Sequence, residues 1–325
     1  MPGLCFLSLS LLSVKRRTSY PVMTEQVAKP SAALVHAPPK TKARGRRGRP
    51  QGSKNRNRRA VALSPSLRCI QEHIKRLLAQ IGDAFTVVDF LCDGERGHND
   101  AMHMVRQVGR HLLSKLRSNA ALYFPYEGPY CGRGPRRKYG QKVDSHHIPS
   151  TYLQSIAMDK EIKTQVYQMS LWHKKFAEML NIVVIVKTNL QTNKTAQVVL
   201  FRSDLTLRYE LLIDDYRLRF QLEFHLRDAK QYWGLEDFMN VNARPVYNGA
   251  NLAMFMVNVS HALMRPMRAQ WSAFSVNDLK AWFRGQKYVI ETLKLLPEPP
   301  DPIFIDQVVS KMAELGRVNH AVNFV

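Results

Sequence analysis

The chain has 325 residues, of which 45% are hydrophobic, enough for a sizeable packed core. Its 48 Lys and Arg against 26 Asp and Glu give a formal net charge of +22, which favours nucleic acid as a partner over a membrane surface or the ribosome. Four scattered cysteines without CxxC spacing argue against a zinc site or a disulfide framework. This cysteine usage is typical of a reducing cytoplasm, so we expect a cytoplasmic, nucleoid-associated protein. No apolar run reaches the ~20 residues of a membrane span.

The N-terminal part is predicted to form two strands followed by a basic loop. Residues 4–14 and 18–27 are typical of strands, and because no Lys or Arg precedes the first, a strand fits better than a signal peptide. Residues 40–59 contain ten Lys or Arg and no acid. This composition predicts a disordered loop within residues 28–62.

A helix and a strand are predicted next. Ser64 can cap the helix N-terminus, Pro65 suits the first helical position, and Gly82 ends the helix. The apolar run FTVVDFLCDG at 85–94 is typical of a buried central strand that brings its final Asp to the carboxyl edge of a sheet.

The rest of the chain is predicted to be mixed and then helical. A Gly-, Pro- and Arg-rich loop at 125–150 carries a basic cluster that is either a DNA contact or a solvated tip. The further elements are expected at 99–108 (helix), 111–123, 161–169, 181–188 and 196–202 (strands), and 205–238, 248–265, 275–284 and 303–315 (helices).

This order predicts an α/β fold with a mixed sheet flanked by helices, a β-rich insertion and C-terminal helices. The expected parts are the first strands of a core (1–27), the basic loop (28–62), the remaining core (63–124), the β-rich insertion (125–204) and a helical part (205–325).

Four polar side chains recur at helical spacing in the long helical stretch. Their offsets of 0, 3, 7 and 14 place them on one helix face: Tyr216, Arg219, Glu223 and Lys230. One interpretation is a solvated face with an Arg219–Glu223 ion pair worth about 0.3–0.5 kcal/mol. Spacing alone does not distinguish this face from a functional one.

The pattern Tyr-x2-Arg-x3-Glu-x6-Lys resembles the YREK signature of insertion-sequence transposases of the IS-four group. The segments DGERGHND (93–100) and RDAKQYWGLEDFMN (227–240) resemble the same family, and the resemblance covers most of residues 4–290. It implies a ribonuclease H-like fold in which two Asp and one Glu hold two Mg2+ ions. Such a site cleaves and transfers DNA strands at the terminal repeats of the element.

The resemblance also assigns roles to individual residues. Asp93 matches the second metal-binding acid and Glu223 the third. Asp89 is the competitor of Asp93, but the Asp-Gly sequence followed by Gly and Asn matches the family at Asp93. Arg219 and Lys230 would contact phosphate near the cut site, while Tyr216 would pack against, or hydrogen-bond to, the DNA backbone.

The first acid departs from the family pattern. Residues 1–24 contain no Asp or Glu, and Ser13 occupies roughly the expected position. A neutral hydroxyl is a poor ligand for a hard cation. The N-terminal helical DNA-binding region of family members is also missing before the first strand, so we expect a truncated or decayed copy. The alternative to an active transposase is a remnant that only binds DNA, and a homodimer is one possible assembly.

A second DNA contact is predicted in the basic loop. The sequence Arg47-Gly48-Arg49-Pro50 resembles an AT-hook, in which arginines enter the narrow minor groove of A·T-rich DNA. The alternative is a solvated loop that binds any polyanion.

Overall fold

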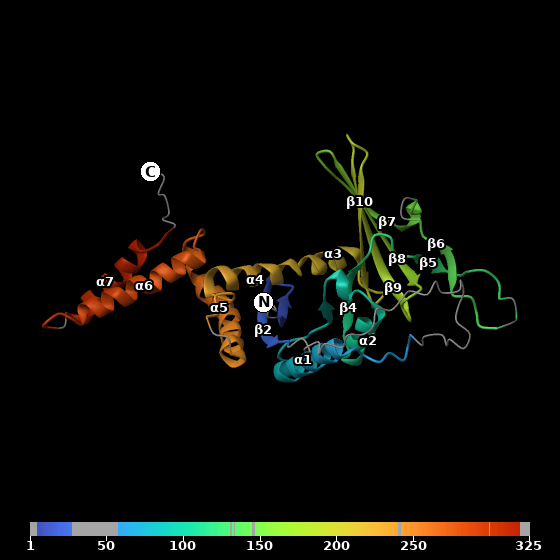
Figure 1. The fold of residues 1–325 in the computed structure, drawn as a ribbon. Coiled ribbons are helices and arrows are strands. Elements are labelled where there is room, and N and C mark those ends of the chain that lie inside the picture. The colour runs from blue at the N-terminus through green and yellow to red at the C-terminus, as the bar shows by residue number, and fades with distance from the viewer. Residues whose placement is uncertain are drawn as a thin grey trace, which may run out of the picture. The chain divides into compact units, whose positions relative to one another are not determined.

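The structure is a computed structural model that describes residues 5–27, 58–130, 132, 134–144, 147–239, 242–298 and 300–318 (Figure 1). The contacts divide the chain into two units, each described by itself. The sheet unit is Ser31–Phe220, and the discontinuous unit combines Met1–Pro30 with Gln221–Val325. No helix in the described ranges is long and apolar enough to cross a membrane.

The sheet unit is built on an eight-stranded mixed sheet in the order β3-β4-β10-β9-β8-β5-β6, with β7 paired to β8. Strands β3 and β4 are parallel, and the other pairs are antiparallel. The strands are β3 (Asp89–Leu91), β4 (His111–Leu116), β5 (Leu122–Pro125), β6 (Tyr139–Lys142), β7 (Leu153–Asp159), β8 (Ile162–His173), β9 (Met179–Asn189) and β10 (Thr195–Arg202). The predicted mixed α/β fold is confirmed.

In the described part of the sheet unit, three α-helices accompany this sheet: α1 (Pro65–Ile81), α2 (Asn99–Gln107) and α3 (Tyr209–Arg217). Helix α1 begins as predicted, because the Ser64 hydroxyl accepts a hydrogen bond from Leu67 N at 3.3 Å. Three short 3-10 turns, η1 (Gly82–Ala84), η2 (Gly94–Arg96) and η3 (Ser150–Tyr152), connect elements. The core beside α3 joins one sheet face to that helix through Leu113, Val166, Val183, Leu200, Leu212 and Tyr216.

The strand predicted at 85–94 is shorter than expected and lies in a different place. Only Asp89–Leu91 is a strand, and β3 lies at an edge of the described sheet. Phe85 and Val88 are 66% and 47% exposed. The prediction of a buried central strand is therefore wrong, because an apolar run does not indicate how many neighbours its strand acquires.

The long helix predicted at 205–238 is also interrupted. Helix α3 ends at Arg217, residues 218–219 form a turn, and α4 (Phe220–Trp233) begins afterwards. Gly234, with a φ of 70°, follows the end of α4. Consequently, the four polar residues at helical spacing do not lie on one continuous helix. We call this group the stripe; its members are Tyr216, Arg219, Glu223 and Lys230.

The discontinuous unit contains a β-hairpin and helices. Strands β1 (Phe6–Ser13) and β2 (Thr18–Gln26) pair antiparallel, as predicted. The remaining helices are α5 (Ala243–Gln270), α6 (Val276–Leu293) and α7 (Pro302–Leu315). The Asn258 and Asn251 side chains of α5 donate hydrogen bonds to Pro21 O at 2.7 Å and Thr24 O at 3.1 Å, which fixes the hairpin on that helix.

Candidate active site

Asp93 follows β3 at the carboxyl end of the strand, and its side chain is 55% exposed. Its Oδ1 accepts a hydrogen bond from Gly94 N at 2.7 Å and lies 3.1 Å from Lys115 Nζ. The backbone donor of Gly94 and then Lys115 hold the pKa of Asp93 below its ordinary value, and the charge of Arg219 acts in the same direction. This acid is therefore ionised and next to two cations.

The turn after Asp93 is packed against β4. A Cβ on Gly97 would lie 2.5 Å from Lys115 O, and one on Gly94 would lie 2.8 Å from Lys115 Cγ. Ser114 Oγ donates a hydrogen bond to Asp93 O at 3.1 Å. Gly97 is therefore needed for close approach to a strand carbonyl, whereas the atoms nearest to Gly94 belong to the Lys115 side chain, which can shift.

Cys92 precedes Asp93 and is 8% exposed. Burial raises the pKa of its thiol to about 11. The side chain is therefore a neutral thiol at physiological pH, and it adds no metal-binding charge beside Asp93.

The rest of the DGERGHND segment supports the fold. His98 Nδ1 accepts a hydrogen bond from Ala101 N at 3.3 Å and so caps α2. Asn99 is 7% exposed, donates to Arg58 O at 3.0 Å and accepts from Ala177 N at 2.9 Å. The Asn99 hydrogen bonds span 41 and 78 residues, so no periodic pattern in the sequence indicates them, whereas the His98 cap is local and was not predicted.

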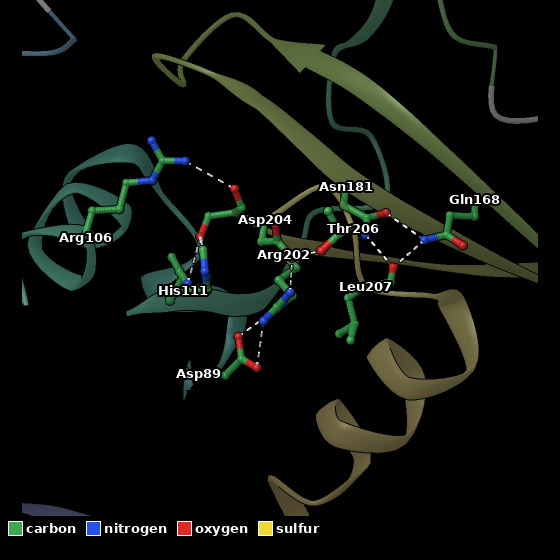
Figure 2. Close-up of polar contacts among 11 residues, drawn as sticks. Asp89, Arg106, His111, Gln168, Asn181, Arg202, Asp204, Thr206 and Leu207 are labelled. Carbon is green, nitrogen blue, oxygen red and sulfur yellow. Dashed lines mark hydrogen bonds and ion pairs between the residues drawn. The ribbon is translucent and has the colours of Figure 1, made fainter. Parts of the chain in front are cut away.

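Asp89, the competitor of Asp93, belongs to a buried ion-pair cluster (Figure 2). Arg202 Nε lies 2.7 Å from Asp89 Oδ1, and Arg202 Nη2 lies 3.2 Å from Oδ2. The same guanidinium pairs with Asp204. The Arg202 and Asp89 side chains are only 6% and 14% exposed. Because Asp89 is held by the scaffold, Asp93 is the better candidate for an active-site acid.

Two residues of the stripe are in the sheet unit. Tyr216 is 8% exposed and packs in the core beside α3, where burial raises its pKa. Arg219 Cζ lies 4.8 Å from the centroid of the Phe220 ring and 5.9 Å from that of Tyr216. The charge of Arg219 lowers the pKa of Asp93, and the charge of Asp93 raises that of Tyr216, so both residues lie within electrostatic range of this acid.

The other two residues of the stripe belong to the discontinuous unit. Glu223 and Lys230 are exposed on α4, where they help to line a shallow depression of about 510 Å³. Lys230 forms an ion pair with Glu236. Ser13 ends β1, and its Oγ accepts a hydrogen bond from Arg16 N at 3.2 Å.

The residues of the metal site that the resemblance implies are divided between the two units: Asp93 is in the sheet unit, whereas Ser13 and Glu223 are in the discontinuous unit. Within the described ranges, no three His, Cys, Asp or Glu side chains come together as metal ligands. Carboxylates are the right donors for Mg2+, but Asp93 is already paired with Lys115 and Ser13 brings no charge. Arg47 and Arg49 of the AT-hook-like motif lie outside the described residues.

An exposed acid at a strand end, flanked by Lys115 and Arg219, suits chemistry on a polyanion. A family model described as DDE superfamily endonuclease matches residues 2–178, which include Asp93 and all strands through β8. The match covers more than half of the chain, which therefore belongs to the DDE superfamily endonucleases. None of the curated proteins matches it.

Proposed function

We propose that this chain is a DDE transposase of an insertion sequence of the IS-four group, acting on the DNA ends of its own element. Membership in the DDE superfamily endonucleases supports phosphodiester chemistry on DNA. The observation that carries the proposal is the environment of Asp93, an ionised, exposed acid that lies beside the cations Lys115 and Arg219. A negatively charged backbone can approach an acid only where such cations offset the repulsion.

In this proposal Asp93 and Glu223 are the two remaining acids, and Mg2+ is the cation that their carboxylates would hold. Arg219 and Lys230 contact phosphate. The burial of Tyr216 supports packing beside Arg219 rather than a direct contact with the DNA backbone. Minor-groove binding by Arg47 and Arg49, and assembly as a homodimer, remain predictions.

A non-catalytic remnant that occupies DNA ends is the second candidate. Two observations favour it: Ser13 stands where the resemblance places the first acid, and Lys115 already neutralises Asp93. Both reduce the negative charge available to a divalent cation.

Nicking of a supercoiled plasmid that carries the gene with its genomic flanks tests the proposal. If the chain is an active transposase, the purified protein should nick this DNA with Mg2+ and not with EDTA, whereas a remnant should bind the DNA without nicking it. Asp93→Asn and Glu223→Gln are expected to reduce nicking to background, because each removes a carboxylate charge. Glu210→Gln, an exposed acid on α3, is the matched control and should retain activity.

Ser13→Asp distinguishes the two candidates. If Ser13 occupies the position of the first acid, restoring a carboxylate should raise Mg2+-dependent nicking, and Glu223→Gln should abolish the gain. DNA binding without nicking in both wild type and Ser13→Asp would identify a remnant.

A further inference from the structure

Four cations lie over aromatic rings at the sheet edge formed by β5 and β6. We call this group of residues the aromatic–basic edge. Lys174 Nζ lies 4.7 Å from the Tyr123 ring centroid, Arg137 Cζ 4.8 Å from that of Tyr126, Lys138 Nζ 5.2 Å from that of Trp172, and Arg136 Cζ 5.9 Å from that of Tyr130. All four distances are within the ~6 Å range of cation–π attraction.

Three of these rings form a partly fixed platform, whereas the cations are exposed. Tyr123, Tyr126 and Trp172 are half-buried. Tyr139 makes edge contacts with Tyr123 at 5.6 Å and with Trp172 at 6.0 Å, and its hydroxyl accepts a hydrogen bond from Arg58 Nη1 at 3.1 Å. Cations ordered by rings lose less side-chain entropy when they bind an anion.

The charge of this surface is strongly positive. Its two acids are Glu127 and Asp144, and Asp144 Oδ2 lies 2.9 Å from His147 Nδ1. The cations in the described residues of 122–144 and 172–175 are Arg136, Arg137, Lys138, Lys142, Lys174 and Lys175. Because basic side chains already lie over these rings, the surface suits phosphates better than base stacking.

We propose that the aromatic–basic edge is a second DNA-binding surface, which holds the phosphates of duplex DNA without reading the bases. It rests on the proposed function only in taking DNA as the partner. Strand β3, which precedes Asp93, is at one edge of the sheet and β5–β6 at the other. The five steps from β3 to β5, at about 4.8 Å each, span roughly 24 Å, the length of about seven base pairs. One duplex can therefore reach both places.

The salt dependence of DNA binding tests this surface. Fluorescence anisotropy would follow the full chain binding a duplex of about 20 base pairs at several salt concentrations. The triple variant Arg137→Ala/Lys138→Ala/Lys174→Ala should lower the slope of log affinity against log salt by about 2–3, since each phosphate contact contributes about 0.9. The control Lys163→Ala/Lys187→Ala/Lys194→Ala removes the same charge outside the edge and should change the slope by less than about 1. Equal losses in both triples would overturn the proposal, because net charge alone would explain them.

Single-ring variants test the platform. Tyr126→Phe keeps a ring beneath Arg137 and should bind like wild type, whereas Tyr126→Leu should weaken binding as much as Arg137→Ala does. Thermal unfolding checks that each variant is folded. Tighter binding of single-stranded DNA that depends on the rings would overturn the duplex assignment in favour of base stacking. Binding is measured with EDTA, apart from nicking, so a chain that binds through this edge without nicking overturns only the proposed active site, and a chain that nicks without the difference between the two triple variants overturns only this surface.

Discussion

Gly97 shows how a single residue positions the candidate active-site acid. Its backbone lies so close to β4 that a Cβ would be 2.5 Å from Lys115 O and 3.1 Å from Ser114 Oγ. A strand carbonyl cannot move away as a flexible side chain can. Gly97→Ala should therefore displace the turn that carries Asp93.

The expected cost of Gly97→Ala is about 1–3 kcal/mol of unfolding free energy, as for other overpacked sites. Urea unfolding measures this cost, and plasmid nicking should fall in parallel if Asp93 is the active-site acid. Glu95→Ala changes an exposed residue of the same turn and should be neutral in both assays. A fully stable Gly97→Ala variant would show that the contact with β4 is not required.

At the scale of elements, the Arg202 cluster joins two strands that are not neighbours. Asp89 is on β3 and Arg202 ends β10, with β4 between them. Burial raises the pKa of Asp204, but the Thr206 hydroxyl and the charge of Arg202 outweigh it, so the net pKa lies below its ordinary value of 3.8. Ionised Asp204 therefore stabilises the fold fully above this ordinary value, and that stability is lost as the pH falls through the lower folded-state pKa.

Asp204→Asn should lower the unfolding free energy near neutral pH by about 1–3 kcal/mol, because a charged hydrogen bond to Arg202 is weakened. The difference from wild type should begin to shrink as the pH falls below the ordinary pKa of 3.8, and should vanish only below the lower folded-state pKa, where Asp204 is protonated in the folded protein as well. Urea unfolding of both proteins at several pH values measures this difference in unfolding free energy. Asp159→Asn, an exposed acid on β7, is the control, and a difference that stays constant in acid would contradict the assignment.

The break between α3 and α4 is a second effect at this scale. Tyr216 and Leu218 are 8% and 3% exposed. Residues two positions apart on a helix point in nearly opposite directions, so one buried helix face cannot accommodate both. Helix α3 ends in a 3-10 turn, in which Leu218 N donates to Asp215 O and Arg219 N to Tyr216 O, both at 3.1 Å, and the spacing of the stripe did not reveal this end.

At the scale of the whole molecule, contacts concentrate within the two units. Each has its own core, with Leu113 fully buried in the sheet unit and Met264 1% exposed in the discontinuous unit. We expect calorimetry to resolve two unfolding transitions. Leu113→Ala should lower the unfolding free energy of the sheet unit, and Met264→Ala that of the discontinuous unit, each by about 2–5 kcal/mol. One transition shifted equally by both variants would contradict this division.

The sequence by itself determined the features that depend on neighbouring residues. The β1–β2 hairpin, the Ser64 cap and the strands at 161–202 follow from alternation, capping chemistry and turn residues. Composition also favoured a polyanionic partner, and the motifs predicted a DDE enzyme, the coarser class that the family model matches over residues 2–178.

Only the tertiary structure decided which charges meet. It placed Asp89 against Arg202, 113 residues away, and Lys115 against Asp93. Strand β3, from the segment predicted as a central strand, lies at the sheet edge. The rings of Tyr123, Tyr126 and Trp172 lie beneath cations. Such contacts depend on how distant strands pair, and periodicity within one segment carries no information about the partners of that segment.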